Sequence, residues 1–279
     1  MAVRKYSLAE GGVSEAIGFM LIFSMVIAGI GLVTLYGYPI LIQQQSSANE
    51  RIMEKNMIVL QNDVKSLAYK TVPYKESSLK VEGGSLTLYN TLSTPAVLKI
   101  DITDCGSTLY VTAFQSGDLR YSSESAGTDI SLQNGAVVMR QHVESGSVML
   151  AEPRWFYDNQ TNTMVINLIG FNSTGILSRT GIGTVQTAMG ATNYTYVNIL
   201  AGNPALCVIY TPDPTANGLD YSVAWDNYFR KILNNPPSIT LSPPPSGMPG
   251  NGGSLRYQLT ILKPMTLVVK KYDMMIKSL

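Results

Sequence analysis

A run of 27 uncharged, mostly apolar residues, 16–42, constrains this 279-residue chain more than any other feature. As a helix, the run would be about 40 Å long, which is enough to cross a bilayer core of about 30 Å. A helix satisfies its own backbone groups in lipid, and the four glycines of this run suit close helix packing in a membrane. A buried core helix is the alternative interpretation. We predict a transmembrane helix over residues 13–42.

The charges that flank this helix predict its orientation. Arg4 and Lys5 precede it, whereas the charged residues that follow it, from Glu50 to Lys55, sum to zero. The positive-inside rule therefore places the N-terminus in the cytoplasm and the chain from about residue 45 onward outside the cell membrane. A cleaved secretory signal is the alternative, but its apolar core would normally be only about 7–15 residues long. We predict a retained, single-pass anchor in the lipid bilayer.

Composition excludes several classes of function. Hydrophobic residues make up 45% of the chain and charged residues 14%, which is too apolar for a disordered protein. The net charge of +1 gives no electrostatic footprint for nucleic acid. One histidine and two cysteines exclude sites with two imidazoles, Cys-rich zinc sites and iron–sulfur clusters within one chain. We expect no nucleic-acid partner, no metal and no cofactor.

The sequence also lacks the motifs of common enzymes. It contains no Gly-x-Ser-x-Gly, no Walker loop and no His-Glu-x-x-His, and Gly181-Ile182-Gly183 lacks the third glycine of a dinucleotide loop. His142 lies in a polar segment, where exposure to solvent is expected. Asp101 and Asp104 lack the spacing of a calcium loop, so we interpret them as loop acids. The sequence predicts no enzyme.

Pro39 and the segment after it predict how the helix continues. Because proline removes a backbone donor, we expect it to kink the helix or end it near the outer membrane face. An apolar stripe with helical spacing then follows: Met53, Met57, Leu60, Val64 and Leu67. It predicts an amphipathic stalk helix over residues 43–72. Its apolar face packs on the protein's own β-domain in the favoured interpretation, and on other subunits in the alternative.

From about residue 78 the apolar pattern changes to a period of two. Gly83-Gly84 predicts a hairpin turn, and Asn134-Gly135 predicts a further turn. The strand-like runs are residues 97–102, 109–114, 135–139, 147–151, 164–168 and 205–210. Short strands separated by turn residues favour a mostly antiparallel, sandwich-like domain over residues 73–279. The fold class is therefore α+β, with a long N-terminal helix before a β-rich extracellular domain.

The C-terminal third carries three further predictions. Residues 219–233 have apolar side chains near one helical face, which indicates a short surface helix with Trp225 and Tyr228 at its boundary. Residues 234–254 contain six prolines and four glycines, which is typical of a long exposed loop. Residues 255–279 alternate again and should form two strands in the same sheet.

The two cysteines, Cys105 and Cys207, are expected to form a disulfide. The predicted topology places both outside the cell, where disulfides persist. Two separate buried thiols are the alternative, because the sequence does not fix their separation. Asn159, Asn172 and Asn193 each begin an Asn-x-Ser/Thr sequon, so they are candidate glycosylation sites on the exposed surface.

The N-terminus resembles that of archaeal type IV pilin-like proteins. The segment Gly11-Gly12-Val13-Ser14-Glu15-Ala16-Ile17-Gly18 leads directly into the apolar helix, as in those proteins. It is similar to an uncharacterised archaeal family of single-span, pilin-like envelope proteins, and the Asn134–Met139 and Glu152–Trp155 segments resemble that family more weakly. The resemblance implies a leader over residues 1–12, which a prepilin-type peptidase would cut after Gly11 or Gly12, leaving Gly12 or Val13 first.

Glu15 has two interpretations. In pilin-like assembly, an acid at this place is thought to meet the free amino terminus of a neighbouring subunit, and the resemblance implies that role. The alternative is local, because an acid in the first turn favours the positive end of the helix dipole, with Ser14 as the N-cap.

Together these features predict a membrane-anchored structural protein of an archaeal cell envelope, a pilin-like or minor pilin-type subunit whose partners are other such subunits. The alternative is a monomeric surface binding protein or adhesin that uses the pilin-type signal only for insertion.

Overall fold

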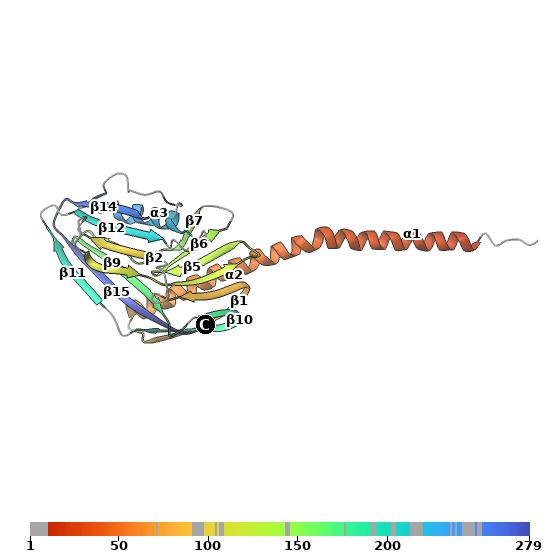
Figure 1. Ribbon diagram of the computed structural model, residues 1–279, viewed down its shortest axis with the longest axis horizontal. Coiled ribbons are helices and arrows are strands. Elements are labelled where there is room, and N and C mark those ends of the chain that lie inside the picture. Colours follow the sequence, from red (N-terminus) through yellow and green to blue (C-terminus); the bar gives the residue numbers. More distant parts are fainter. Residues whose placement is uncertain are drawn as a thin grey trace, which may run out of the picture. The chain divides into compact units, whose positions relative to one another are not determined.

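The computed structural model describes residues 11–70, 72–90, 98–103, 105, 109–142, 146–175, 177–190, 194–201, 205–212, 220–234, 236–237, 239–241, 249 and 253–279. The chain divides into two compact units, Met1–Ala48 and Asn49–Leu279. The described part of the first unit is helical, and the second combines helices with two β-sheets, so the fold is α+β (Figure 1).

The N-terminal part of the described chain is one uninterrupted helical run. Helix α1 spans Gly11–Leu32, a π-helical turn η1 spans Val33–Gly37, and helix α2 spans Tyr38–Lys70. Among the described residues this is the one helix long and apolar enough to cross a membrane. The prediction that Pro39 could end the helix is wrong. The π-turn lies just before Pro39, and its Tyr38 N–H bonds to the Val33 carbonyl, so the backbone widens locally and the helix continues.

The second part of α2 belongs to the core of the β-rich unit. Its predicted stripe is buried, and Met53, Met57 and Leu67 have no exposed surface. These side chains pack against strand residues such as Tyr121 and Phe171. The interpretation that this face packs on the protein's own β-domain is therefore confirmed. The same face is not available to other subunits.

The described strands form two sheets, and both are mostly antiparallel. The larger sheet has the order β7 (Ser147–Ala151), β6 (Ala136–Gln141), β5 (Thr128–Gln133), β4 (Asp118–Ser123), β1 (Tyr74–Tyr89), β10 (Leu177–Met189), β15 (Met265–Ser278), β9 (Thr163–Asn172) and β8 (Phe156–Asp158), and β11 (Tyr194–Leu200) also pairs with β15. The smaller sheet has the order β13 (Ile239–Leu241), β14 (Leu255–Ile261), β12 (Ala205–Pro212), β2 (Leu98–Thr103) and β3 (Leu109–Gln115). Among the described pairs, β9 with β15 is the parallel one.

Two hydrophobic clusters hold the β-rich unit together. One joins α2 to the larger sheet. The other joins the two sheets and helix α3 (Ser222–Leu233). Strands β9 and β15 contribute to both clusters: Ile166 and Leu267 belong to the second, whereas Phe171 and Met274 belong to the first. The larger sheet therefore has apolar contacts on both faces.

The Asn134-Gly135 turn is confirmed, but the Gly83-Gly84 hairpin is wrong. Asn134 and Gly135 both have positive φ between the paired strands β5 and β6. Gly83 and Gly84 instead lie within the single strand β1, where the register with β10 shifts. A Cβ at Gly84 would lie 2.3 Å from the Ser122 carbonyl oxygen, so glycine allows the close approach of β4 rather than a chain reversal.

Three predictions for the C-terminal third are corrected. Helix α3 is not a surface helix, because Trp225 and Phe229 are fully buried and Tyr228 almost so. Strands β14 and β15 lie in different sheets rather than the same one. Residues 234–254 include the short strand β13, and residues 235, 238, 242–248 and 250–252 of that segment lie outside the described part.

Candidate functional site

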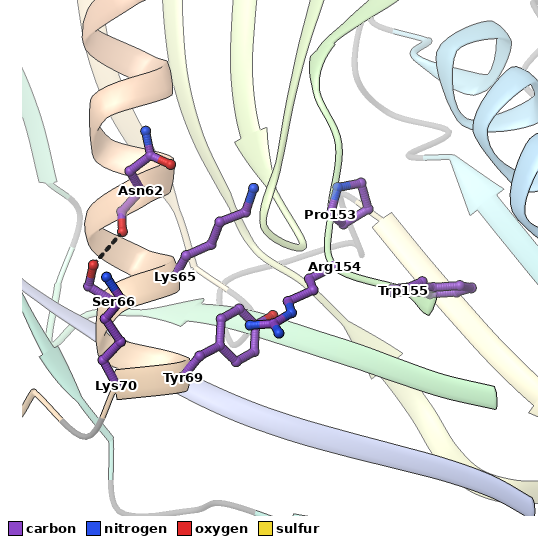
Figure 2. Close-up of a pocket in the computed structure, with 8 residues that line it drawn as sticks. All are labelled: Asn62, Lys65, Ser66, Tyr69, Lys70, Pro153, Arg154 and Trp155. Carbon is purple, nitrogen blue, oxygen red and sulfur yellow. Dashed lines mark hydrogen bonds between the residues drawn. The ribbon is translucent and has the colours of Figure 1, made fainter. Parts of the chain in front are cut away.

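A groove lies at the C-terminal end of α2. It has a volume of about 540 Å³ and is lined by Asn62, Lys65, Ser66, Tyr69, Lys70, Pro153, Arg154 and Trp155 (Figure 2). A second cavity of about 400 Å³ shares Tyr69 and Arg154 with it and adds Phe156, Lys270 and Tyr272. Together they form a basic, aromatic surface, which we call the Arg154 groove.

Arg154 is one of the two side chains shared by the cavities, and aromatic rings lie against it. Its guanidinium carbon lies 4.9 Å from the centre of the Tyr69 ring and 5.9 Å from that of Phe156. Tyr272 packs edge-on against Tyr69, with ring centres 5.6 Å apart. A guanidinium stacked on its face keeps its N–H donors, which lie in its plane, free for an anion.

The segment Glu152–Trp155, between β7 and β8, forms one wall of the groove, and α2 holds its beginning. Gln61 Nε2, which is buried, donates to the Glu152 carbonyl at 3.0 Å and to the Gly135 carbonyl at 2.7 Å. Lys65 Nζ donates to the same Glu152 carbonyl at 3.2 Å. The helix therefore fixes the wall through the backbone.

The remainder of this wall is fixed from β9 and α3. Asn167 donates to the Arg154 carbonyl, and Trp155 Nε1 donates to the Asn167 carbonyl at 2.8 Å. Tyr228 Oη donates to the Pro153 carbonyl at 3.3 Å. Backbone carbonyls of three successive residues thus have donors, so the groove is formed before any ligand arrives.

Two groups in the groove have shifted pKa values. Burial lowers the pKa of Lys65, and the nearby Arg154 charge lowers it further, while Glu152 opposes the shift. Burial raises the pKa of Tyr69, so its hydroxyl stays protonated. That hydroxyl oxygen is buried, and it has no hydrogen-bond partner among the residues that the structure describes. The groove can therefore offer positive charge and an unused O–H donor to an anionic or hydroxyl-rich ligand.

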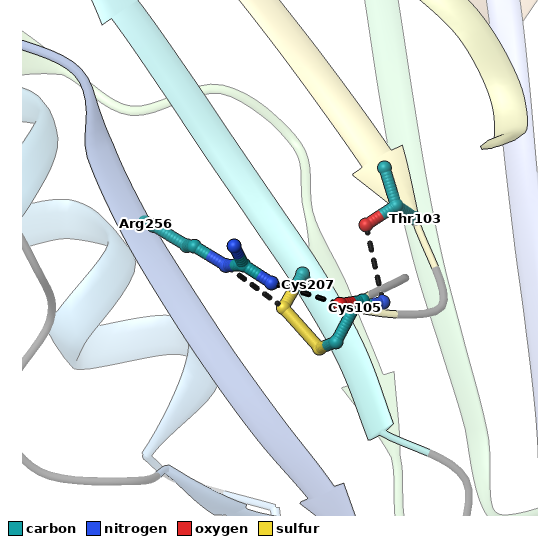
Figure 3. Close-up of a disulfide and its surroundings, with 4 residues drawn as sticks. All are labelled: Thr103, Cys105, Cys207 and Arg256. Atoms are coloured by element: carbon teal, nitrogen blue, oxygen red, sulfur yellow. Dashed lines mark hydrogen bonds between the residues drawn. A yellow bond between two sulfur atoms is a disulfide. The ribbon is translucent and has the colours of Figure 1, made fainter. Parts of the chain in front are cut away.

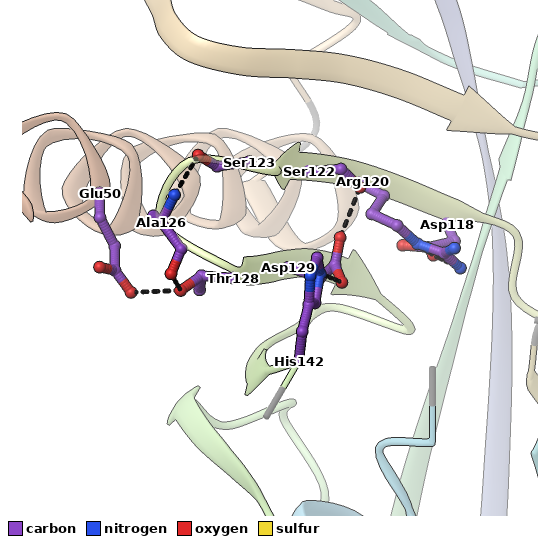
Figure 4. A network of polar contacts seen from close by, with 9 residues as sticks. All are labelled: Glu50, Asp118, Arg120, Ser122, Ser123, Ala126, Thr128, Asp129 and His142. Atoms are coloured by element: carbon purple, nitrogen blue, oxygen red, sulfur yellow. Dashed lines mark hydrogen bonds and ion pairs between the residues drawn. The ribbon is translucent and has the colours of Figure 1, made fainter. Parts of the chain in front are cut away.

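A buried polar cluster occupies the β4–β6 part of the larger sheet (Figure 4). Arg120 and Asp118 form a buried ion pair, with Nε 2.8 Å from the carboxylate. Burial works to lower the pKa of Arg120, but Asp118 raises it above its usual value. The two charges attract one another in a low-dielectric interior. We therefore interpret the pair as a structural feature of the sheet rather than as a ligand site.

The single histidine pairs with a buried acid in the same region. His142 is exposed as expected, and its Nε2 lies 2.5 Å from a carboxylate oxygen of the buried Asp129. Ser122 donates to the other carboxylate oxygen. In a Ser-His-Asp triad the histidine stands between the other two residues. Here the aspartate stands in the middle, and it is the carboxylate rather than the imidazole that contacts the serine.

The structure bonds Cys105 to Cys207, with Cα atoms 4.9 Å apart (Figure 3). Thr103 at the end of β2 lies opposite Cys207 of β12, so the bridge extends the pairing of these two strands. Arg256 Nη2 donates to the Cys105 carbonyl at 3.0 Å, and its Nε lies 3.4 Å from the Cys207 sulfur. The disulfide thus joins two strands of the smaller sheet, with β14 beside them.

The residues of the predicted processing site lie at the start of α1. The helix includes Gly11, Gly12 and Val13, and Glu15 is exposed on it. Because the helix begins before Ser14, the prediction that Ser14 is its N-cap is wrong for the full chain. After a cut behind Gly12, Glu15 would be the third residue of the remaining chain.

Of the other predicted residues, Asn159 and Asn172 are not among those that line the groove. Asn159 is exposed in the turn between β8 and β9, and Asn172 ends β9, half-buried. Asn193 and Asp104 lie outside the described residues, and for Asp101 the backbone alone is described, within β2. No group of three or more His, Cys, Asp or Glu side chains in the described part of the chain is placed to hold a metal ion.

Sequence reasoning did not find the Arg154 groove. Its residues come from α2, the β7–β8 connection, β8, β9 and β15, which lie far apart in the chain. The one part of the groove that the sequence analysis singled out was the Glu152–Trp155 segment. It was chosen because it resembles a pilin-like family, not because of the chemistry of its side chains. Lys65 and Tyr69, one helical turn apart and beside the buried stripe, could have marked the helix side of the groove.

Comparison with known proteins gives one finding. No curated protein and no solved structure matches the chain. A family profile described as "Family of unknown function (DUF7289)" matches residues 12–214, which include the apolar helix and the strands up to β12. Since the match covers most of the chain, the protein belongs to this family of unknown function, DUF7289.

Proposed function

We propose that this protein is anchored in the cell membrane by its N-terminal helix and acts, with its β-rich domain outside, as a pilin-like structural subunit of an archaeal envelope assembly. One observation carries the proposal. Every large apolar side chain from Ile17 to Ile42 is exposed on the chain by itself, whereas the stripe from Met53 to Leu67 is buried.

Such an apolar surface needs a non-aqueous environment. Exposed apolar area costs roughly 25 cal/mol per Å² in water, and large patches mark membrane or protein contacts. Apolar residues occur all round this part of the helix, without a polar stripe. A helix that is apolar on every side is typical of a membrane span rather than of a one-sided protein contact.

Orientation and assembly rest on further residues. Arg4 and Lys5 before the span favour a cytoplasmic N-terminus. The Cys105–Cys207 disulfide favours an oxidising exterior for the domain. The Gly11-Gly12 pair and Glu15 support the pilin-like part, because they stand where such proteins carry their processing site and their first acid. Contacts between subunits would use the apolar half of the helix, because the stripe from Met53 to Leu67 in the other half already packs on the larger sheet.

The alternative is a monomeric, membrane-anchored surface binding protein. The Arg154 groove favours it, because a preformed basic and aromatic hollow has no evident use in a purely structural subunit. In that case the same helix serves for anchoring alone.

The N-terminal sequence of the native protein tests the pilin-like part. A start at Gly12 or Val13 is expected, because a prepilin-type peptidase leaves the apolar helix at the new N-terminus. A start at Met1, Ala2 or Asn49 would contradict it. Sedimentation of the native protein then separates the two functions: filaments support the structural subunit, and a detergent-solubilised monomer supports the binding protein.

Anchoring and orientation are tested separately. The protein should stay in the membrane fraction after carbonate extraction, and protease added to intact cells should digest the domain. A full-length variant with Ile22→Asp and Ile27→Asp should be released, because each acid near the centre of a span costs about 2.5–3.5 kcal/mol. Release of the unchanged protein, or protection of its domain, would overturn anchoring or orientation respectively.

A further inference from the structure

We propose that the Arg154 groove is a binding site for an acidic saccharide, a sugar chain whose rings carry carboxylate or sulfate groups. The proposal goes beyond the function above and holds whether the domain acts as a subunit or as a monomer. Four features of the groove carry it: its charge, its free donors, its aromatic surface and its size.

The charged side chains that line the groove are all positive. Lys65, Lys70 and Arg154 line the larger cavity and Lys270 lines the smaller one, while neither lining includes Asp or Glu. The acids beside the lining in sequence, Asp63 and Glu152, have cationic partners outside it: Lys75 lies 3.7 Å from Asp63, and Lys231 lies 2.6 Å from Glu152. Three cations around one hollow repel one another unless an anion lies between them; the pKa of Lys65 is lowered first by burial and then by the Arg154 charge.

Donors remain free for that anion. In the described part of the chain, no carboxylate pairs with Lys70 or Arg154. The face of the Arg154 guanidinium lies over the Tyr69 ring, so the N–H groups along its edge remain available to a ligand. The Tyr69 side chain lines both cavities, and within the described residues its buried hydroxyl has no hydrogen-bond partner. Buried polar atoms in folded proteins nearly always have a partner, so a ligand oxygen at this hydroxyl would complete its hydrogen bonding.

The aromatic side chains favour a ring over a simple inorganic anion. Tyr69, Tyr272 and Phe156, the last 40% exposed, surround the smaller cavity. Sulfate or phosphate alone would use the cations and leave these rings in water. A sugar ring offers apolar C–H faces to the aromatic surface and hydroxyls to Tyr69 and Asn62, while its acid group meets Arg154.

The size of the groove agrees with this ligand. The two adjoining cavities of about 540 and 400 Å³ fall in the range of roughly 300–1,000 Å³ that is usual for small-molecule sites. They share Tyr69 and Arg154, so a chain of two or more sugar rings can extend from one cavity to the other. Its wall is fixed by backbone hydrogen bonds, so little ordering is required on binding.

Calorimetric titration of the full chain in non-ionic detergent tests the proposal. The probes are tetragalacturonate, neutral maltotetraose, sodium sulfate and tetraglutamate at one ionic strength. Binding of tetragalacturonate at least about tenfold tighter than each of the others is expected, because ring contacts and charge act together. Equal binding of maltotetraose or sulfate, tighter binding of the acidic peptide, or no binding of tetragalacturonate at millimolar concentration would each overturn it.

Matched variants locate the site. Lys70→Gln with Arg154→Gln should weaken tetragalacturonate binding at least about tenfold, since each loses a charge-assisted hydrogen bond. Lys80→Gln with Lys263→Gln removes the same charge from exposed positions outside the groove and should change binding less than about twofold. Equal losses in both double variants would show a general charge effect and overturn the assignment to this groove.

Tyr69→Phe separates recognition from packing. It removes only the unpartnered hydroxyl, so thermal stability should not fall, while tetragalacturonate binding should weaken about three- to tenfold. Unchanged binding would show that the hydroxyl does not meet the ligand and would overturn the placement of the sugar at the junction of the two cavities.

Discussion

The two halves of the N-terminal helical run have the same backbone and opposite surroundings. From Ile17 to Ile42 the large apolar side chains are exposed on the isolated chain, and Leu32 keeps 59% of its surface. From Asn49 to Lys70 the stripe from Met53 to Leu67 falls on one face, and Leu67 is completely buried against the larger sheet, whereas Ile52 and Val59 lie off the stripe and are exposed. The difference shows that helix formation alone does not determine what the helix packs against. The arrangement of polar residues around the helix indicates whether it packs on the protein's own sheet.

Polar side chains make the same contrast. Thr34 in the first half donates only to the Ile30 carbonyl of its own helix. Gln61 in the second half is buried and donates to carbonyls of two other segments. The second half is thus a part of the domain core, and the following predictions test that division.

The largest effect is expected for the disulfide. Cys105→Ser with Cys207→Ser should lower the free energy of unfolding of the domain by up to about 4–5 kcal/mol, because the bridge closes a loop of about 100 residues in the unfolded chain. Urea unfolding in detergent, followed by fluorescence of Trp155 and Trp225, measures it. Membrane retention should not change. Two free thiols in the denatured, unreduced native protein would show that the bond is absent.

Matched leucines test the apolar contrast directly. Leu67→Ala should cost about 2–5 kcal/mol of domain stability, because it leaves a cavity against the sheet. Leu32→Ala, with an exposed side chain, should change it by less than about 0.5 kcal/mol. The same urea experiment on the full-length protein compares them. Equal costs would mean that the first half also packs on the domain and that the division is wrong.

Matched glutamines test the polar contrast. Gln61→Ala should cost about 1–3 kcal/mol, because the Gly135 carbonyl loses its side-chain donor and the Glu152 carbonyl keeps only that of Lys65. Gln44→Ala, exposed in the first half, should have no measurable effect on domain unfolding. Because Gln61 also holds the wall of the Arg154 groove, its variant should bind tetragalacturonate more weakly. A stable Gln61→Ala domain would contradict the importance of these hydrogen bonds.

The smallest effect is expected for a pair of threonines. Thr128 Oγ1 donates to the Glu50 carboxylate at 2.8 Å, where the helix enters the domain. Thr128→Val should cost about 0.5–1.5 kcal/mol, whereas Thr34→Val should cost nearly nothing in domain unfolding. Differential scanning calorimetry of both proteins would resolve the difference. If Thr34→Val lowered the stability of the domain more than Thr128→Val does, the contrast between the two halves of the helix would be contradicted.

Part of the fold was predictable, because some patterns depend only on neighbours in the chain. The stripe from Met53 to Leu67 has helical spacing, and its burial follows from that spacing. Asn134-Gly135 suits a turn with two positive φ angles, and the structure has it. Gly83-Gly84 carries a similar signal but lies inside β1, because the close approach of Ser122 on β4, a tertiary contact, requires the small residues there.

Other features depended on partners that the sequence does not name. The apolar face of α3 gave no indication that both sheets would enclose Trp225. The alternation after residue 255 predicted two strands but not that they belong to different sheets. The mixed polar strands β4 and β5 were missed, because Asp118 and Arg120 are buried as a pair and break the usual alternation of apolar and polar residues.

The sequence by itself determined the local properties: an apolar helix free of charge, a helical stripe, strands of period two and two cysteines. These follow from side-chain chemistry and spacing along one chain. Only the tertiary structure decided which faces meet, which is why Cys105 lies beside Cys207 and why Arg154 stacks on Tyr69 from 85 residues away. The physical reason is that pairing across the fold depends on the combined burial of many distant apolar groups, and no short segment contains that information.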